Sequence, residues 1–396
     1  MKKLNRFAQL ATVSAFALFL IAAMLLTYRA RHKGYSFYEN RNLAPRPAYS
    51  AGAVLDGTWF SALESYLIDR AAGHNTLARL NARLDIALRR PTVNNVVVED
   101  DLLLAMLPYQ AADAAALEAR SERMAERLQE IDALVSSCGG QFCHVLVPSH
   151  YAYYADRYPA FLNNFAEDTA LRRASFRAAL ERRGVDYVDL WDTFAALGFP
   201  SELGSAVDHH YSVYGAYEIY RAVLEHFNER GAGLTVYDAF DDAQIDKPYL
   251  GSRMRKLLGA WQSDERLHYF VPRDEIPFTR SDNGHESAST VFAFPAADDE
   301  WVTYSFFMGG DIPHTVIDTH RDELPSILIY GDSFTNALES IAYVSFDETH
   351  SLDFRYYTDQ LTLGEYIEQY RPDYVICVRD YEVLLETGGN GVGVDG

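Results

Sequence analysis

Apolar positions along the chain change their spacing at several points, and each spacing predicts a different element. Residues 7–28 form a run of 22 residues without a formal charge, which is the length of a helix that crosses a bilayer. Residues 57–88 place apolar side chains at helical spacing, and residues 111–135 do the same on a long, charged helix. We therefore expect a membrane-spanning segment followed by a helical lead-in.

From residue 144 onward, short apolar runs alternate with helical segments. Strands are predicted at residues 144–147, 185–190, 327–330, 351–354 and 374–378, and helices at 168–183, 214–230, 335–343 and 363–371. This alternation is typical of a parallel sheet covered by helices on both faces, which is a three-layer α/β fold. Such sheets bind ligands at the carboxyl ends of their strands.

Residues 231–325 interrupt the alternation. They are rich in Asp, Pro, Gly and aromatic residues, with β-like pieces at 289–294 and 302–307, and they are too long for a plain loop. We interpret them as a β-containing insertion in the α/β domain. The predicted organisation is a cytoplasmic tip and transmembrane anchor at 1–33, a linker and helical lead-in at 34–91, the α/β domain at 92–385 and a flexible tail at 386–396.

Charge and flanking sequence narrow the choice of compartment and partner. The net charge of −21 gives a surface that repels nucleic acid, so no nucleic-acid partner is expected. The apolar run exceeds the 7–15 residues of a cleavable signal, and no clear Ala-x-Ala site follows it, which favours an uncleaved anchor. Basic residues flank the run on both sides, so the positive-inside rule leaves its orientation open.

Cysteines and aromatic residues give weaker evidence about the fold and the function. Three cysteines, Cys138, Cys143 and Cys377, give no disulfide framework, although Cys138 and Cys143 could pair in an oxidising compartment. The chain has no Cys-x-x-Cys pair, so a structural zinc site is not expected. The 27 tyrosines and 22 phenylalanines suit stacking on sugars, but packing in the core is their more common use.

The apolar run at 327–330 ends in a Gly331-Asp332 turn that brings Ser333 to the start of a predicted helix. A serine at such a turn is exposed at a sheet edge, with helix N–H groups nearby to hold an oxyanion. Acyl transfer requires a hydroxyl activated by a base, and a third group that fixes the tautomer of the base. Ser333 is the candidate nucleophile, and the alternative is a plain helix N-cap.

Asp208 and His210 are the candidate partners of this serine. On an extended backbone, residues two apart project to the same side, so the Asp208 carboxylate would hold Nδ1 of His210 and leave Nε2 for Ser333. His209 would then point the other way. Two alternatives are a metal bound by His209 and His210, and an Asp208 cap on the helix that begins near Val213. We expect no metal and no organic cofactor.

The stretch Asp208-His209-His210-Tyr211, followed by residues 214–217, resembles the signature of the DHHW-type proteins. These are relatives of the AlgX/AlgJ alginate O-acetyltransferases and have an SGNH-hydrolase-like fold. Matching pieces follow in order over most of residues 36–385, at 39–44, 306–313, 331–338, 353–357 and 372–375. The resemblance implies Ser333 as nucleophile, His210 as base and Asp208 as the orienting acid, in a permuted chain order.

The resemblance also implies a location and a reaction. The family acts outside the cytoplasmic membrane on exported polysaccharide, and a membrane-bound O-acyltransferase usually supplies its acyl group. A single-pass membrane protein is therefore implied, with a catalytic domain outside the cytoplasm that moves an acetyl group to a hydroxyl of a cell-surface polysaccharide. If water replaced the sugar, the same site would be a carbohydrate esterase. A non-catalytic, glycan-binding scaffold of an export complex is the third possibility.

Two departures from the family pattern bear on the site. Tyr211 stands where the signature has Trp, which keeps an aromatic side chain and makes Tyr211 a candidate for contact with the substrate. No Gly-x-Asn-Asp motif follows the strand predicted at 374–378, so the asparagine that usually supplies an oxyanion donor is missing. Asn336, Arg355, Arg379 and the N–H of Ser333 are the candidate replacements.

Overall fold

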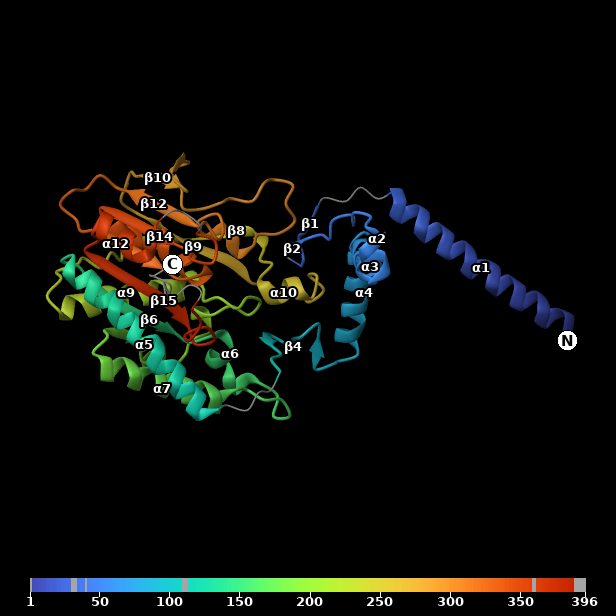
Figure 1. Cartoon of the computed structure of the whole chain (residues 1–396), viewed down its shortest axis with the longest axis horizontal. Helices are drawn as coiled ribbons and strands as arrows, with labels where there is room; N and C mark the ends of the chain where they lie inside the picture. The colour runs from blue at the N-terminus through green and yellow to red at the C-terminus, as the bar shows by residue number, and fades with distance from the viewer. Residues whose placement is uncertain (1, 30–33, 40, 109–112, 358–360, 388–396) are drawn as a thin grey trace. The chain divides into compact units, whose positions relative to one another are not determined.

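The computed structural model describes residues 2–29, 34–39, 41–108, 113–357 and 361–387 (Figure 1). The chain divides into two compact units. The N-terminal unit comprises Met1–Val96 and Met254–Gln262, and the α/β unit comprises Val97–Arg253 and Ser263–Gly396. Asp208, His210 and Ser333 all belong to the α/β unit.

The N-terminal unit begins with α1 (Lys2–Arg29), whose Gln9–Arg29 portion is long and apolar enough to cross a membrane by length and composition. The expected apolar N-terminal helix is therefore present. The elements that follow are β1 (Tyr35–Ser36), β2 (Arg41–Asn42), α2 (Ala51–Leu55), α3 (Thr58–Asp69), α4 (His74–Ala87) and β3 (Thr92–Val93). Gly73 joins α3 to α4 with a φ of 76°, a conformation that glycine adopts without steric cost.

An eight-stranded sheet forms the middle layer of the α/β unit, in the order β11-β10-β12-β14-β13-β15-β6-β7. The strands are β6 (Gln141–Val147), β7 (Tyr187–Asp189), β10 (Thr279–Asp282), β11 (His285–Ser287), β12 (His314–Asp318), β13 (Ile327–Tyr330), β14 (Glu348–Leu352) and β15 (Tyr374–Asp380). From β14 to β7 all neighbours are parallel, which confirms the predicted sheet. The insertion adds β10, β11 and β12 to this sheet as an antiparallel extension.

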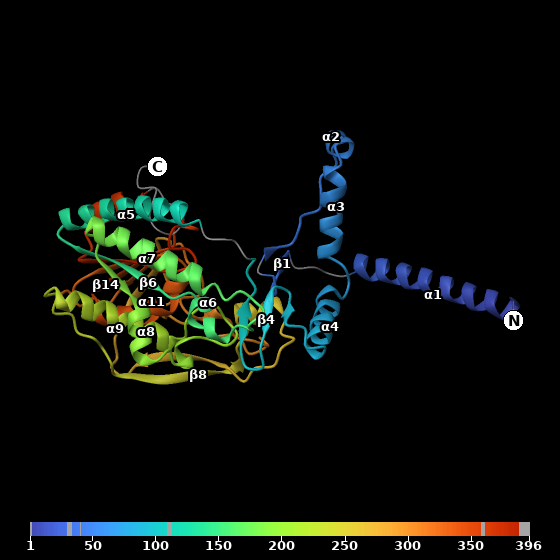
Figure 2. The same ribbon diagram turned by 90° about the horizontal axis from the view of Figure 1, so that it is seen from below.

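Helices cover both faces of the sheet. In Figure 2, α5 (Ala114–Ser137) and α7 (Ala166–Arg183) lie on one side of β6, and α8 (Leu190–Leu197) and α9 (Val213–Glu229) lie on the other. α12 (Leu363–Tyr370) packs with α5, and α11 (Asn336–Ala342) packs with α9. Every residue of β13 and β15 is buried, because a parallel sheet between two helical layers has no wet face.

The remaining elements are short or lie outside these layers. They are β4 (Val96–Val98), β5 (Leu103–Ala105), α6 (His150–Tyr153), η1 (Ala155–Arg157), η2 (Ser201–Leu203), β8 (Phe240–Pro248), α10 (Ser252–Lys256), β9 (Arg266–Pro272), η3 (Tyr304–Phe306), η4 (Ser333–Thr335) and η5 (Tyr343–Ser345). Residues 388–396 of the tail predicted at 386–396 lie outside the described residues.

Two predicted strands end earlier than expected for local reasons. The strand predicted at 185–190 ends at Asp189, whose carboxylate accepts from the N–H of Trp191 and caps α8. The strand predicted at 351–354 begins earlier and ends at Leu352, because Asp353 accepts from the N–H of Arg355 and turns the chain. In both places an aspartate side chain competes with the strand ladder.

One other prediction for the α/β unit is wrong, and one possibility that the sequence left open is not realised. The pieces at 289–294 and 302–307 form only isolated bridges, and Tyr304–Phe306 is a 3₁₀ turn. Aromatic side chains there pack on one another instead of alternating across a sheet. The possible pairing of Cys138 with Cys143 is absent, since all three cysteines are free thiols and Cys143 is buried in β6.

Candidate active site

Polar side chains gather where the central parallel strands end. Ser333 follows β13, Arg355 follows β14, Arg379 and Asp380 close β15, and His150 follows β6. Because the carboxyl ends of parallel strands meet at one edge of the sheet, these side chains are brought to the edge where α/β folds bind their ligands. The sheet therefore determines where a site can form.

The turn that carries Ser333 depends on close packing. A Cβ atom on Gly331 would lie 2.5 Å from the carbonyl oxygen of Val378, so only glycine fits between β13 and β15. Asp332 caps η4, with Oδ1 accepting from the N–H of Phe334 at 3.0 Å. Since Asp332 supplies the cap, the Ser333 hydroxyl is available for another partner, and it is half-buried.

That partner is His210. Nε2 of His210 lies 2.8 Å from Oγ of Ser333, and Nδ1 of His210 lies 2.7 Å from Oδ1 of Asp208. Because a carboxylate only accepts hydrogen bonds, Nδ1 carries the proton and Nε2 is the acceptor that faces the hydroxyl. The structure thus brings together the three residues that the sequence singled out, in the order that a serine nucleophile requires.

Asp208 is buried and is held as a carboxylate. Its Oδ2 accepts from the N–H of Ser252 at 2.7 Å, and its Oδ1 also accepts from the Ser252 hydroxyl at 3.2 Å. Burial acts to raise the pKa of Asp208, but the charge of His210 and hydrogen bonds from His209 and His210 outweigh it. The pKa therefore lies well below its usual value, and Asp208 is ionised opposite the imidazole.

The backbone at this site is bent, which corrects the extended geometry expected from the sequence. Oδ1 of Asp208 accepts from the N–H groups of His209 at 2.6 Å and His210 at 3.1 Å, and this turns the chain. The two imidazole rings lie on the same side, with centroids 3.8 Å apart, so His209 does not point away. The expected cap on α9 comes from Ser212, which accepts from the N–H groups of Tyr214 and Gly215.

His209 belongs to the support of Asp208. Its Nδ1 lies 2.6 Å from Oγ of Ser252, the residue that also donates to Asp208. Burial lowers the pKa of His209, so the ring beside Asp208 favours its neutral form. His209 therefore supports Asp208 through Ser252, whereas His210 is the imidazole that faces Ser333.

Tyr304 covers the face of the His210 ring and was not predicted as a site residue. The rings are stacked, with centroids 3.7 Å apart and planes 4° from parallel. Phe334 lies near His210 as well, at 5.0 Å. Tyr304 comes from η3 in the insertion, so the insertion contributes directly to the surroundings of the imidazole.

A second unpredicted group supports the turn before Asp208. The Glu265 carboxylate accepts from the Ser205 hydroxyl at 2.6 Å and from the N–H of Ala206 at 2.9 Å. Oγ of Ser205 in turn accepts from the N–H of Asp208 at 3.0 Å. Burial raises the pKa of Glu265 to about 7. Glu265 lies 60 residues from Ser205 and 59 from Ala206 in sequence, so no local pattern marks it.

Asn336 and Arg355 meet at Asp311. Nδ2 of Asn336 lies 3.3 Å from one oxygen of Asp311, and Nη2 of Arg355 lies 3.2 Å from the other. Arg355 also pairs with Asp353 at 2.6 Å, and its guanidinium lies over the ring of Tyr356. The side chains of Arg355 and Asp311 are each one-third exposed, so this part of the cluster is open to solvent. Asn336, which stands three residues after Ser333 in the sequence, is buried.

Arg379 and Tyr211, two of the candidate oxyanion or substrate residues, are instead buried beside the turn that carries Ser333. The Arg379 side chain is 2% exposed, and its Nη1 lies 2.7 Å from Oδ2 of Asp332. Arg379 therefore supports the turn that carries Ser333. Tyr211 is buried, and its ring meets Phe334 edge to face at 5.6 Å. The aromatic character shared with the signature Trp thus serves packing behind the site.

Two groups of potential metal ligands occur among the described residues. In the first, Asp208, His209 and His210, the carboxylate already accepts from the His210 ring and Nε2 of His210 faces Ser333. In the second, Cys143, Asp186 and His226, the carboxylate pairs with His226 at 2.9 Å and with Arg230. Both arrangements are accounted for by hydrogen bonds and ion pairs among the protein side chains.

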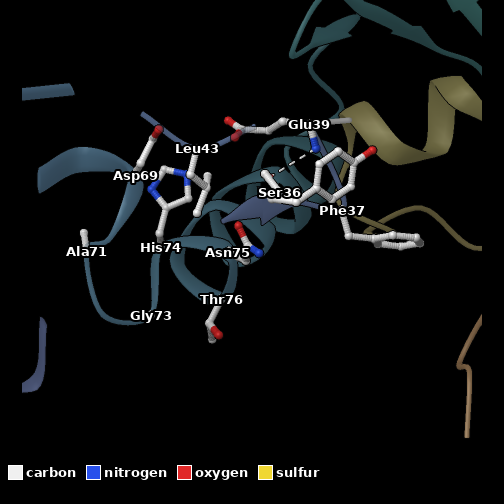
Figure 3. A pocket seen from close by; sticks show the side chains of 11 residues that line it. Ser36, Phe37, Glu39, Leu43, Asp69, Ala71, Gly73, His74, Asn75 and Thr76 are labelled. Atoms are coloured by element: carbon white, nitrogen blue, oxygen red, sulfur yellow. Dashed lines mark hydrogen bonds between the residues drawn. The ribbon is translucent and has the colours of Figure 1, made fainter. Parts of the chain in front are cut away.

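The matching piece at 39–44 lies in the N-terminal unit, beside a cavity of about 340 Å³ (Figure 3). Arg41 forms two hydrogen bonds with Asp69, at 2.6 and 2.9 Å, and Asp69 also accepts from the N–H of Ala44. The hydrogen bond from Arg41 lowers the pKa of Asp69 to about 2. These contacts fix the segment after α1, while Asn40 lies outside the described residues.

Comparison with solved structures shows which known proteins share this fold. The sequence matches no protein-family model, and a search of curated proteins finds no match. Bacillus cereus PatB1 with a sulfonyl adduct matches at TM-score 0.61 and 18% identity, over 76% of this chain and 98% of PatB1. A DHHW family protein from Eubacterium siraeum matches at TM-score 0.56 and 20% identity, over 76% of this chain and 95% of that protein.

A weaker likeness is that to the O-acetyltransferase domain of Pseudomonas putida AlgJ, with a TM-score of 0.46 and 15% identity over 74% of this chain and 93% of that domain. The first two matches extend over three quarters of the chain and nearly the whole of each partner. The chain therefore has the fold of PatB1 and of the DHHW family protein, as the resemblance in its sequence implied.

Proposed function

We propose that the protein transfers an acyl group, most simply acetyl, through an ester on Ser333 to a hydroxyl of an exported or cell-surface polysaccharide. The observation that carries the proposal is the pair of contacts on one imidazole. Nε2 of His210 is 2.8 Å from the Ser333 hydroxyl, and Nδ1 is 2.7 Å from an ionised, buried Asp208. The resemblance of the sequence to the alginate O-acetyltransferases supports the same reaction class.

In the first half-reaction, Oγ of Ser333 attacks the carbonyl carbon of the donor ester while Nε2 of His210 takes the hydroxyl proton. The resulting imidazolium is stabilised by Asp208. The tetrahedral intermediate places negative charge on the former carbonyl oxygen, for which Asn336 and the N–H of Ser333 are the proposed donors. When the intermediate collapses, the donor alcohol leaves with the proton from His210, and the acyl group remains on Ser333.

In the second half-reaction, a sugar hydroxyl replaces the donor alcohol. Its oxygen attacks the acyl carbon as Nε2 of His210 takes its proton, and Ser333 leaves with that proton. The exposed cluster of Asp311, Arg355 and Tyr356 is the proposed surface for the sugar, since it offers hydrogen-bonding groups beside an aromatic face. No proton is gained or lost over the cycle.

The proposed location is the outer face of a membrane, with α1 as a single-pass anchor. The length and composition of α1 support this, as does the polysaccharide context that the resemblance implies. A membrane-bound O-acyltransferase is the proposed acyl donor.

A carbohydrate esterase with the same residues is the second candidate, because water can replace the sugar in the second half-reaction. The test is to incubate the purified protein with an activated acetyl ester and with bare or acetylated oligosaccharide, and to follow the oligosaccharide mass. Gain of acetyl by the bare acceptor supports the transferase. Loss of acetyl alone would assign the esterase. Equal binding of oligosaccharide by the protein and by Ser333→Ala, with no turnover in either, would assign the non-catalytic scaffold.

A further inference from the structure

Helix α4 of the N-terminal unit exposes a continuous row of leucines. Leu77, Leu80 and Leu84 in the helix and Leu88 at its C-cap are 64%, 63%, 55% and 62% exposed. Spacings of three and four residues place all four on one side of the helix. We call these four residues the leucine row. A row of large apolar side chains this exposed marks a surface that another apolar phase covers.

The preceding helix also exposes large apolar side chains. Phe60, Leu67 and Ile68 of α3 are 55%, 49% and 51% exposed, and no residue of α3 is buried. Figure 2 shows α3 and α4 end to end within the N-terminal unit. The two helices together present seven large apolar side chains that pack on no core.

The opposite side of α4 is fixed to its own unit, so the leucine row is held outward. Ala82 is fully buried, and Nε of Arg79 donates to the carbonyl oxygen of Leu258 at 2.7 Å. Arg79 also hydrogen-bonds the hydroxyl of Tyr38. Rotation of the helix to bury the leucines would break these contacts.

The first 90 residues of the chain are basic, and the remaining residues are acidic. Residues 1–90 hold 13 basic and 5 acidic side chains, a net charge of +8, whereas residues 91–396 hold 22 basic and 51 acidic, a net charge of −29. Arg83, Arg89 and Arg90 lie beside the leucine row and are exposed. A basic, amphipathic helix in an otherwise acidic protein complements an anionic lipid surface.

The same helices are joined to the end of the candidate membrane span. Oγ1 of Thr27, in the last turn of α1, accepts from the N–H of Ala72 between α3 and α4 at 3.1 Å. If α1 crosses a bilayer, its last turn lies at the bilayer surface, and this hydrogen bond brings the junction of α3 and α4 to the same level. The apolar surface then begins where the span ends.

We propose that α3 and α4 lie on the membrane, with Phe60, Leu67 and the leucine row inserted among the acyl chains and Arg83, Arg89 and Arg90 among anionic headgroups. This inference rests on the proposed anchoring by α1, and it adds a second membrane contact that fixes the N-terminal unit against the bilayer. A second copy of the chain fits less well. Pairing two leucine rows would bring the flanking arginines of both copies together.

The test uses the full-length protein in vesicles of phosphatidylcholine and phosphatidylglycerol, with a Cys138→Ser background because Cys138 is the only partly exposed cysteine of the three. Single cysteines at Leu80→Cys and Leu84→Cys carry an environment-sensitive NBD label. Leu18→Cys in α1 reports on the anchor, and Glu130→Cys on α5, whose side chain is 56% exposed, reports on water. Quenching is measured with nitroxide lipids and with aqueous iodide.

The expected result is strong quenching by nitroxide lipids at positions 18, 80 and 84, and quenching by iodide alone at 130. If position 18 responds to nitroxide lipids while 80 and 84 respond only to iodide, the inference fails and the anchor stands. If 80 and 84 are shielded from both quenchers, protein covers the leucine row and the inference also fails. If position 18 responds only to iodide as well, the proposed anchoring fails with it.

Discussion

The ring of Tyr304 lies face to face with the imidazole of His210, with centroids 3.7 Å apart and planes 4° from parallel. Tyr304 comes from the insertion and His210 from the loop before α9, and 94 residues of chain separate them. The contact fixes the plane of the imidazole that faces Ser333. The insertion is thus joined to the site through one aromatic pair.

We expect Tyr304→Leu to lower the rate of acyl transfer about 3- to 10-fold, since an aromatic pair contributes about 0.5–1.5 kcal/mol beyond its buried area. Tyr304→Phe keeps the ring and should retain nearly full activity. The measurement is kcat with an activated acetyl ester, with unfolding curves for both variants. Equal activity of the Leu and Phe variants would show that the stacked ring does not orient His210.

Asp208→Asn should reduce kcat by about 10⁴, the loss seen when the acid of a Ser-His-Asp triad becomes an amide that stabilises the wrong tautomer. An asparagine still accepts from the N–H of Ser252 through its side-chain oxygen, so the turn should remain folded. His226→Gln is the matched control, because His226 pairs with Asp186 and contacts neither Asp208 nor Ser333. Comparable losses in both variants would contradict the role of Asp208.

Arg379→Met should lower the free energy of unfolding by about 3–5 kcal/mol, because it leaves the buried Asp332 carboxylate without the guanidinium that lies 2.7 Å away. Arg221→Met removes two ion pairs, with Glu218 and Glu225, on the partly exposed face of α9 and should cost less than about 1 kcal/mol. Chemical denaturation measures both. Adding Asp332→Asn to Arg379→Met should recover part of the lost stability. If none is recovered, the Arg379–Asp332 ion pair is not the cause of the loss.

Glu265 predicts a dependence of stability on pH. Burial raises its pKa from 4.5 to about 7, so between these values the native state keeps a proton that the unfolded chain has released. The free energy of unfolding should therefore fall as pH rises through this interval, by up to about 3 kcal/mol, and level off above it. Glu265→Gln should remove that part of the slope, whereas the exposed Glu275→Gln should keep it. Parallel slopes in all three proteins would refute the prediction.

The central sheet and the three reacting residues follow from local sequence patterns. The runs that became β13 and β15 are apolar because both sheet faces are covered, so their length and composition identify them. β14 is mostly polar in sequence, and the strand predicted at 351–354 overlaps only its last two residues. Asp208 and His210 stand two residues apart, and Gly331 marks the turn before Ser333. Each of these signals lies within a few residues, which is the range that sequence patterns report well.

Features that depend on distant partners could not be read in this way. Tyr304 and Glu265 reach the site from the insertion, and the antiparallel strands β10, β11 and β12 join the sheet without a strong alternating pattern. The bend at Asp208 was missed because an aspartate that accepts from the next two N–H groups overrides an extended backbone. The sequence suggests Arg379 as an oxyanion donor, but in the structure it pairs with Asp332. Asp332 stands 47 residues earlier, so no local pattern reveals this pair.

The most direct test of the account is to trap the acyl group on the protein. The wild-type protein is mixed briefly with an activated acetyl ester, quenched in acid and digested, and the acetylated peptide is located by mass. A sulfonyl fluoride, chosen because PatB1 forms a sulfonyl adduct, serves as an independent probe of the same hydroxyl. We predict one label, on Ser333, which His210→Ala strongly reduces and Ser340→Ala leaves unchanged. A label on another residue, or equal labelling of Ser333 without His210, would contradict the proposed mechanism.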